Sequence, residues 1–374
     1  MCRRHIISIT HMKKQPVAVL IAKRRIPERS VGLKTISLIT SVSERRDLYL
    51  EYIKQSNIKN HKDMKIVTVE PLGISNAQFE QLQKEFKEQG HEFVFFTDRN
   101  ENPDELARRI GDADIVVISN IKLSAETMGR CPNLKMLSVA FTGLDHIDLD
   151  YCTSHNITVM NASGYSTVAV SELAIGLMLD VYRKISHFDS QIRNGGTRAN
   201  YLGLELGGKT VGVVGTGAIG TQTIRLLMAF GCNVLAYSRT ERQNVKDLGV
   251  TYVSLDELMK NSDIITLHVP LNKETYHLIG KYELSLMKPS AILINTARGN
   301  VVDIPELANM LKDGTLAGAG IDVFEMEPPL PHDHPLCDAP NCVLVPHIGY
   351  ATREAFDIRA DIVMENIRQW LKKQ

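Results

Sequence analysis

From Met64 onward, short runs of apolar and β-branched residues alternate with segments in which apolar residues recur at helical spacing. This alternation is typical of strand–helix–strand units, whose strands lie parallel in one sheet with helices on its faces. The chain has 374 residues, 44% of them apolar, a length that allows two or three domains with large cores. The pattern therefore predicts an α/β protein built on parallel sheets.

The first series of strands and helices predicts one domain over residues 64–164. Its first helix begins with a capping box, in which Ser75 and Gln78 satisfy each other's backbone amides, and ends at Gly90. The predicted strands of this domain are 66–69, 93–96, 114–118, 134–139 and 157–160.

A long apolar helix, 168–182, leads out of this domain to a second series that begins at Thr210. Helix starts in this series are marked by a capping box at Ser254 and a cap at Asp303. The last helix, 352–371, is longer than the second sheet needs, so we expect it to return to the first domain. The first domain is then discontinuous, 64–164 with 347–374, and the second domain, 165–346, is inserted into it. The predicted strands of the second series are 211–214, 233–237, 264–269, 291–295, 318–323 and 342–345.

Composition narrows the possible functions. No apolar run approaches the roughly 18 residues that span a bilayer. The six cysteines show neither CxxC spacing nor a nearby histidine pair, which favours reduced thiols in a cytoplasmic protein and no metal site. Residues 64–374 contain 29 Lys and Arg against 38 Asp and Glu, a balance that argues against nucleic acid as a partner.

The basic leader, residues 1–63, contains 14 Lys and Arg against 5 Asp and Glu. A targeting peptide is disfavoured because the leader includes acids such as Glu28 and Glu44 and has no secretory apolar segment with a cleavage site. A flexible basic tail is a second interpretation. We favour a third, in which Met64 is the natural start and the leader is extraneous, the result of an upstream start choice.

A glycine-rich turn follows the first strand of the second series. In the segment VGVVGTGAIG, Gly215, Gly217 and Gly220 stand between an apolar strand and a helix. Three glycines at this spacing permit a tight turn, close approach of the backbone to a pyrophosphate, and close packing of helix on strand. The free amides at the start of the helix then face the phosphates. We therefore predict that this turn, with Ala218 and Ile219, binds a dinucleotide. Together with the strand–helix alternation, we predict that both domains are Rossmann-like or flavodoxin-like.

The choice of dinucleotide depends on the end of the next strand, which reads Ser238, Arg239. An Asp or Glu at this place would accept hydrogen bonds from the ribose hydroxyls of NAD. Ser238 can instead donate to a 2′-phosphate, and Arg239 can pair with it. This favours NADP. The alternative is that Arg239 stacks on the adenine and that NAD binds through other contacts, so the use of NAD or of both cofactors stays open.

Three candidate catalytic residues follow later strands, at the strand ends where ligands of open α/β sheets lie. Arg298 has a planar, permanently charged fork that matches the carboxylate of a 2-keto acid. His347 can protonate a carbonyl oxygen as a hydride arrives, since histidine titrates near neutrality. Glu327 can be its partner. Each residue alone is also compatible with a surface ion pair or an exposed turn.

Residues 64–374 resemble the D-isomer-specific 2-hydroxyacid dehydrogenase family. The resemblance rests on the order and spacing of NASGYSTVAVSELAIGLML, GTGAIG, INTARGNVVD, GAGIDVFEMEP and PHIG. It implies an NAD(P)-dependent enzyme that reversibly reduces a 2-keto acid to a D-2-hydroxy acid. It also implies a homodimer, with the long helix after Tyr165 at its interface, and hinge closure between the two domains.

The resemblance assigns roles to individual residues. Arg298 would bind the substrate carboxylate and carbonyl, and His347, assisted by Glu327, would exchange the proton. The remaining contacts would be made by the backbone of Phe141, Thr142 and Gly143 to the substrate carboxylate, by Asp322, Thr296 and Ala297 to the nicotinamide, and by His268, Val269 and Pro270 on the adenosine side.

The chain departs from the family pattern in lacking the acidic ribose acceptor and in carrying the basic leader. It also stops at Gln374, so we expect no long 3-phosphoglycerate dehydrogenase with a C-terminal regulatory domain. Two alternatives stay open on the same scaffold: a dinucleotide-sensing corepressor that binds peptides, and a formate or phosphite dehydrogenase. The substrate also stays open among glyoxylate, hydroxypyruvate, pyruvate and bulkier keto acids.

Overall fold

The structure is a computed structural model that describes residues 63–374. These residues contain two sheets, one of five strands and one of seven, and every strand pairing in them is parallel. The predicted α/β class is therefore confirmed. The prediction for the basic leader lies, except at Asp63, outside the described residues. Within residues 63–374, no helix has both the length and the apolar character that crossing a membrane requires.

The first sheet has the strand order β2-β1-β3-β4-β5. Its strands are β1 (Lys65–Thr68), β2 (Glu92–Phe95), β3 (Ile115–Ile118), β4 (Met136–Val139) and β5 (Thr158–Asn161). The helices between them are α3 (Asn76–Glu88), α4 (Pro103–Ile110), α5 (Ala125–Gly129) and α6 (Leu149–Ser154). Every residue of β3 and β4 is buried, as expected for central parallel strands covered on both faces. The predicted capping box at Ser75 is present at the start of α3.

The second sheet has the strand order β12-β11-β10-β9-β6-β7-β8. Its strands are β6 (Thr210–Val214), β7 (Asn233–Tyr237), β8 (Thr251–Tyr252), β9 (Ile264–Leu267), β10 (Ile292–Asn295), β11 (Gly318–Ile321) and β12 (Cys342–Leu344). Its connections include α9 (Ala218–Ala229), α10 (Gln243–Lys246), α11 (Leu255–Asn261), α12 (Lys281–Ser285), the 3₁₀ turn η2 (Gly299–Val301) and α13 (Ile304–Lys312). The caps predicted at Ser254 and Asp303 are both present. Strand β8 was not predicted, because two residues are too few to show a period.

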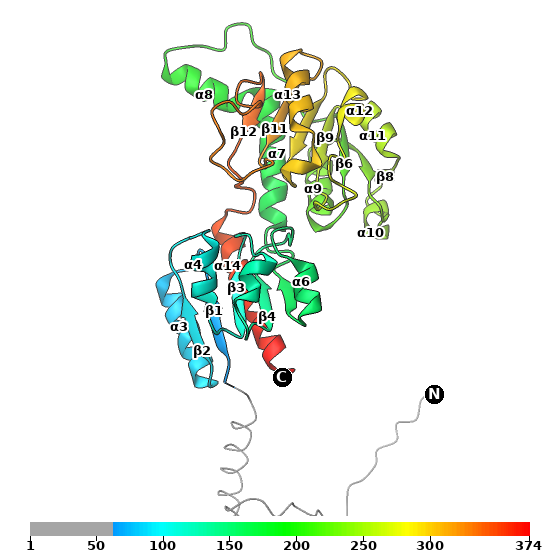
Figure 1. The fold of residues 1–374 in the computed structure, drawn as a ribbon. Helices are drawn as coiled ribbons and strands as arrows, with labels where there is room; N and C mark the ends of the chain where they lie inside the picture. Colours follow the sequence, from blue (N-terminus) through cyan, green and yellow to red (C-terminus); the bar gives the residue numbers. More distant parts are fainter. Residues whose placement is uncertain (1–62) are drawn as a thin grey trace, which may run out of the picture. The chain divides into compact units, whose positions relative to one another are not determined.

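Three further helices connect or complete the two sheets. Helix α7 (Thr167–Arg183) packs against β10, β11, β12 and α9, so its apolar face belongs to the core of the second sheet. Helix α8 (Ile185–Arg193) follows a left-handed residue at Lys184 and was not predicted. Helix α14 (Arg353–Leu371), red in Figure 1, packs beside β4 and β5 of the first sheet. The predicted return of the last helix is thus confirmed, whereas the predicted domain limits stay a prediction.

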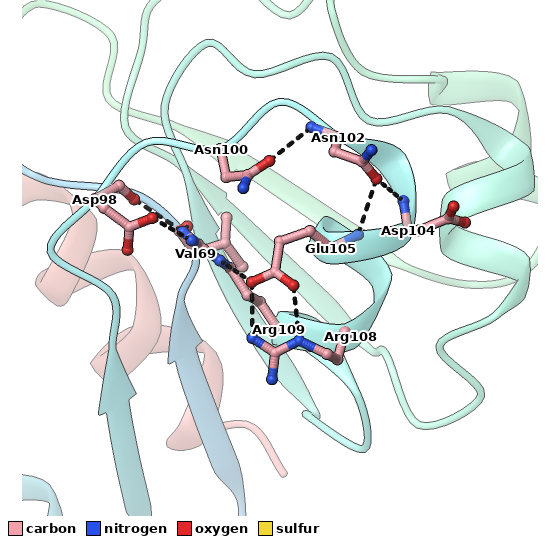
Figure 2. A network of polar contacts seen from close by, with 8 residues as sticks. All are labelled: Val69, Asp98, Asn100, Asn102, Asp104, Glu105, Arg108 and Arg109. Atoms are coloured by element: carbon pink, nitrogen blue, oxygen red, sulfur yellow. Dashed lines mark hydrogen bonds and ion pairs between the residues drawn. The ribbon is translucent and has the colours of Figure 1, made fainter.

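A buried arginine fixes the carboxyl edge of the first sheet (Figure 2). Arg109 donates to the carbonyl oxygens of Val69, directly after β1, at 2.9 Å and of Asp98, after β2, at 2.8 Å. The guanidinium also pairs with the carboxylates of Asp98 and Glu105 and lies 4.6 Å from the ring centre of Phe96. A buried charge without partners is energetically costly, so Arg109 must keep these contacts. They therefore hold the loops after β1 and β2 in one arrangement.

Helix α14 should be essential to the stability of the first sheet. Ile367 is fully buried in the core of that sheet, so Ile367→Ala removes buried apolar contacts and leaves a cavity. We expect the free energy of unfolding to fall by about 2–5 kcal/mol, measured by urea denaturation. The exposed Gln369→Ala, on the same helix, should change it by less than about 0.5 kcal/mol. Equal effects of the two substitutions would contradict this role of α14.

Candidate active site

A cavity of about 820 Å³ lies at the carboxyl ends of strands from both sheets. The first sheet contributes the loops after β4 and β5, and the second contributes the loops after β6, β9, β10, β11 and β12. The predicted site residues that line it are Phe141, Thr142, Gly143, Gly217, Ala218, Ile219, His268, Val269, Pro270, Thr296, Ala297, Arg298, Asp322 and His347. The predicted residues outside its lining are Gly215, Gly220, Ser238, Arg239 and Glu327.

The three glycines of the turn after β6 have different surroundings. A Cβ on Gly220 would lie 1.9 Å from the carbonyl oxygen of Gly215, and a Cβ on Gly215, whose φ is +97°, would lie 2.6 Å from that of His268. Gly217, at the start of α9, lines the cavity, and no atom of the described part of the chain lies within 4 Å of its Cβ position. Gly215 and Gly220 are therefore required by neighbouring backbone, whereas Gly217 keeps space open in front of the helix amides.

Two polar atoms at the cavity have no hydrogen-bond partner among residues 63–374. The Oγ1 of Thr296 and the Nδ1 of His268 are buried and unpaired, although both residues line the cavity. The other ring nitrogen of His268 lies 3.0 Å from the hydroxyl of Thr266, and burial lowers the pKa of His268 to about 3, so the ring is neutral at physiological pH. Buried polar atoms usually have partners. Together with the free helix amides, these atoms fit a bound dinucleotide.

His347 and Glu327 form a direct contact. The Nδ1 atom of His347 lies 2.9 and 3.0 Å from the two carboxylate oxygens of Glu327. The hydrogen bond from His347 is the main reason that the pKa of Glu327 is lowered, so this acid is ionised at neutral pH. His347 has a φ of +55°, a left-handed conformation that is uncommon for residues other than glycine and that surrounding contacts must maintain.

Asp322 supplies contacts that maintain this backbone. Its two carboxylate oxygens accept hydrogen bonds from the amides of Ile348, at 2.6 Å, and Gly349, at 2.9 Å. Its carbonyl oxygen accepts from the amide of His347 at 2.8 Å. The side chain is buried, and burial raises the pKa of Asp322 while the two amides oppose the rise. The family resemblance assigns Asp322 to the nicotinamide, and the contacts of Asp322 with the loop that carries His347 were not predicted.

Arg298 follows β10 of the second sheet and contacts the loop after β4 of the first sheet. Its Nε atom is 3.3 Å from a carboxylate oxygen of Asp145, and its Nη1 donates to the carbonyl of Ala297 at 2.8 Å. A Cβ on Gly143 would lie 1.9 Å from Nη2, so the guanidinium occupies the place that a side chain there would need. The loop after β4 therefore surrounds Arg298. Arg298 was predicted from its place after a strand and Gly143 from the family resemblance, whereas Asp145, which is 153 residues from its partner, was not predicted.

Aromatic rings flank the two candidate catalytic residues. The ring of Phe141 lies 5.4 Å from the guanidinium carbon of Arg298 and edge-on to the imidazole of His347 at 5.9 Å. Tyr350 lies edge-on to both Phe141 and His347, each at 5.2 Å. Phe141 was predicted for its backbone alone, and Tyr350 was not predicted, although it lies three residues after His347. These rings restrict the orientation of the imidazole.

Comparison with known proteins identifies the family. A model of the D-isomer-specific 2-hydroxyacid dehydrogenase NAD-binding domain matches residues 175–349. A glyoxylate reductase of Thermococcus litoralis is 41% identical over 277 residues, which cover 71% of this chain and 83% of the relative. The chain belongs to the D-isomer-specific 2-hydroxyacid dehydrogenases. A hydroxypyruvate reductase of Blautia hydrogenotrophica is 34% identical, over 72% of this chain and 85% of that protein.

Solved structures agree with this assignment. An acyclic imino acid reductase in complex with NADPH and D-Arg has a TM-score of 0.75 and 31% identity, covering 83% of this chain and 98% of that one. The D-lactate dehydrogenase of Aquifex aeolicus, in complex with NAD and lactic acid, has a TM-score of 0.71 and 31% identity, covering 82% and 96%. This 2-hydroxyacid dehydrogenase is therefore an NAD(P)-dependent 2-keto acid reductase with an NAD(P)-binding domain.

The space in front of Gly217 should be needed for the dinucleotide and not for the fold. Gly217→Ala introduces no contact within 4 Å and has a φ of −67°, so we expect an unfolding free energy within about 0.5 kcal/mol of the parent. The added methyl should nevertheless weaken NAD(P)H binding by about tenfold or more, measured by nucleotide fluorescence, because the backbone must closely approach the pyrophosphate. Gly176→Ala, in α7, is the matched control, since it also meets no atom. Unchanged affinity of Gly217→Ala would contradict this role.

Proposed function

We propose that this dehydrogenase reversibly reduces a 2-keto acid to the D-2-hydroxy acid, with Arg298 as the carboxylate-binding residue and His347 as the general acid. The observation that carries the proposal is that the two line one cavity, with His347 bonded to the ionised Glu327. A permanently charged fork and a proton donor side by side are what an α-keto carboxylate requires.

A nicotinamide cofactor held by the glycine turn and by the loops after β9 and β10 would supply the hydride for the carbonyl carbon. Arg298 keeps Nη2 free of partners among the described residues, beside Gly143, so this edge can bind the substrate carboxylate and carbonyl oxygen. Glu327 accepts a hydrogen bond from the Nδ1–H of His347, which leaves the Nε2–H to give its proton to the carbonyl oxygen as the new C–H bond forms. In the oxidative direction the same nitrogen takes the hydroxyl proton back.

The direct test is an absorbance assay with NADH and NADPH against a panel of keto acids. The panel begins with glyoxylate and hydroxypyruvate, the substrates in the names of two relatives, and continues through pyruvate to branched and aryl keto acids. The corepressor alternative predicts nucleotide binding without turnover of any keto acid. Failure of every panel member to oxidise either cofactor would therefore rule out the proposed reaction.

Replacing the general acid should separate turnover from cofactor binding. We expect His347→Ala to lower kcat by about 10²–10⁴-fold while the Kd for NAD(P)H changes by less than about threefold, since the ring acts on the reacting proton. Glu327→Gln should give a smaller loss of kcat, because the imidazole remains but loses its charged partner. Steady-state kinetics and nucleotide fluorescence measure the two quantities. Equal losses of turnover and of cofactor binding would contradict the assignment.

We also propose NADPH as the preferred cofactor, with NADH as a usable second. The support is chemical: Ser238 and Arg239 directly follow β7, and the amide of Gly215 bonds to the carbonyl of Tyr237 at 2.8 Å. The end of β7 therefore lies beside the glycine turn, where the adenosine ribose of a dinucleotide binds.

Ser238→Asp should move the preference towards NADH. An aspartate would accept hydrogen bonds from the ribose hydroxyls and repel a 2′-phosphate. We expect the NADPH/NADH ratio of kcat/KM to fall by about tenfold or more. The activity with NADH should be retained. An unchanged ratio would show that this position does not face the 2′ position of the ribose.

The predicted homodimer remains part of the proposal. Helix α8 has no buried residue, and large apolar side chains on α8 and the following loop are exposed: Ile185, Ile192, Leu202 and Leu204. Several large exposed apolar side chains within one short segment are what a contact surface would offer. The surface follows directly from α7, the helix that the family resemblance places at the interface, which supports a second copy of this chain as the partner.

A further inference from the structure

Arg239, the residue proposed to bind a 2′-phosphate, already forms an ion pair with an acid. The Nη1 atom of Arg239 lies 2.5 Å from a carboxylate oxygen of Glu274. Arg239 follows β7, and Glu274 lies in the loop after β9. In the sheet, β7 and β9 are the two neighbours of β6, the strand that leads into the glycine turn. The ion pair therefore connects the loops on either side of the cofactor-binding turn.

Hydrogen bonds hold the segment that carries Arg239 against the glycine turn after β6. The hydroxyl of Tyr252 accepts from the amide of Arg242 at 3.1 Å and donates to the hydroxyl of Thr216, within the turn, at 2.8 Å. With the bond from Gly215 to Tyr237, this contact ties both ends of the segment 238–242 to the turn. Arg239 is thus placed beside the dinucleotide site by its neighbours and does not depend on Glu274 for its position.

Hydrogen bonds within the loop after β9 fix the backbone at Glu274. Asn272 lines the cavity, and its side-chain oxygen accepts from the amides of Glu274 at 2.8 Å and Thr275 at 3.1 Å. The carboxylate of Glu274 is not used by these bonds. It is consequently free to contact Arg239, and replacing it with an amide leaves the loop's own hydrogen bonds in place.

We propose that Glu274 is a specificity-determining residue that limits the preference for NADP over NAD, by competing with the 2′-phosphate for Arg239. The inference rests on the proposed NADP contact of Arg239. A phosphate that pairs with the guanidinium must share it with a carboxylate of the same charge sign, and this like-charge contact weakens NADP binding. NAD carries a hydroxyl at this position and meets no such repulsion. The neighbouring Glu241 is paired with Lys246 at 2.5 Å, so its charge is already compensated.

The test is Glu274→Gln, with the Kd of NADP⁺ and NAD⁺ measured by calorimetry in the absence of substrate. Both side chains of the pair are largely exposed, 78% for Arg239 and 68% for Glu274, so the effect should be modest because solvent screens it. We expect tighter NADP⁺ binding by about three- to tenfold, an NAD⁺ affinity unchanged within about twofold, and a larger difference at low salt. Glu365→Gln, an exposed acid of α14 paired with Arg368, makes the same charge change and should alter neither affinity.

Two further variants separate failure of this inference from failure of the cofactor proposal. Arg239→Ala should weaken NADP⁺ binding, and adding Glu274→Gln to it should give a smaller gain than in the parent. If Arg239→Ala leaves NADP⁺ affinity unchanged, the phosphate contact and the inference both fall. If Arg239→Ala weakens NADP⁺ binding but Glu274→Gln does not tighten it, or changes NAD⁺ to the same extent, only the role of Glu274 is overturned.

Discussion

Parallel strand pairing is the constraint on which the site depends. Because all strands of a parallel sheet end at the same edge, the loops after β6, β9, β10, β11 and β12 meet at one side of the second sheet. The glycine turn and the loops that carry Arg298 and His347 come together there although well over a hundred residues separate the first from the last. The loop after β4 adds the corresponding edge of the first sheet, and the cavity lies where these loops converge.

Within that cavity, a buried acid supports an unfavourable backbone. His347 adopts a left-handed φ of +55°, and Asp322 binds the two amides that follow it. The desolvation that raises the pKa of Asp322 is offset in part by those amides. The strained conformation directs the imidazole to Glu327 on one side and places it among the rings of Phe141 and Tyr350. Local strain at a reacting group is typical of enzyme sites, where the surrounding structure maintains it.

Both arginines that the sequence singles out are paired with acids that it did not reveal. Arg298 contacts Asp145, in the loop after β4 of the first sheet, and Arg239 contacts Glu274, in the loop after β9. Each acid occupies part of the guanidinium that a ligand would also use. An arginine's affinity for an anion depends on such competing partners, which differ in position from one fold to the next. The presence of Arg239 is therefore insufficient to determine the strength of the cofactor preference.

The sequence by itself determined most of the elements and the family. Periodicity and caps predicted most strands within two residues, the long helix α7, and the return of α14, because these depend on local side-chain patterns. The motifs GTGAIG, INTARGNVVD and PHIG predicted the family, since glycines and catalytic side chains recur at fixed short spacing. Strand β8 and helix α8 carried too weak a local signal. Only the tertiary structure revealed the contacts of Asp145, Asp322, Tyr350 and Glu274, because each joins loops that follow different strands.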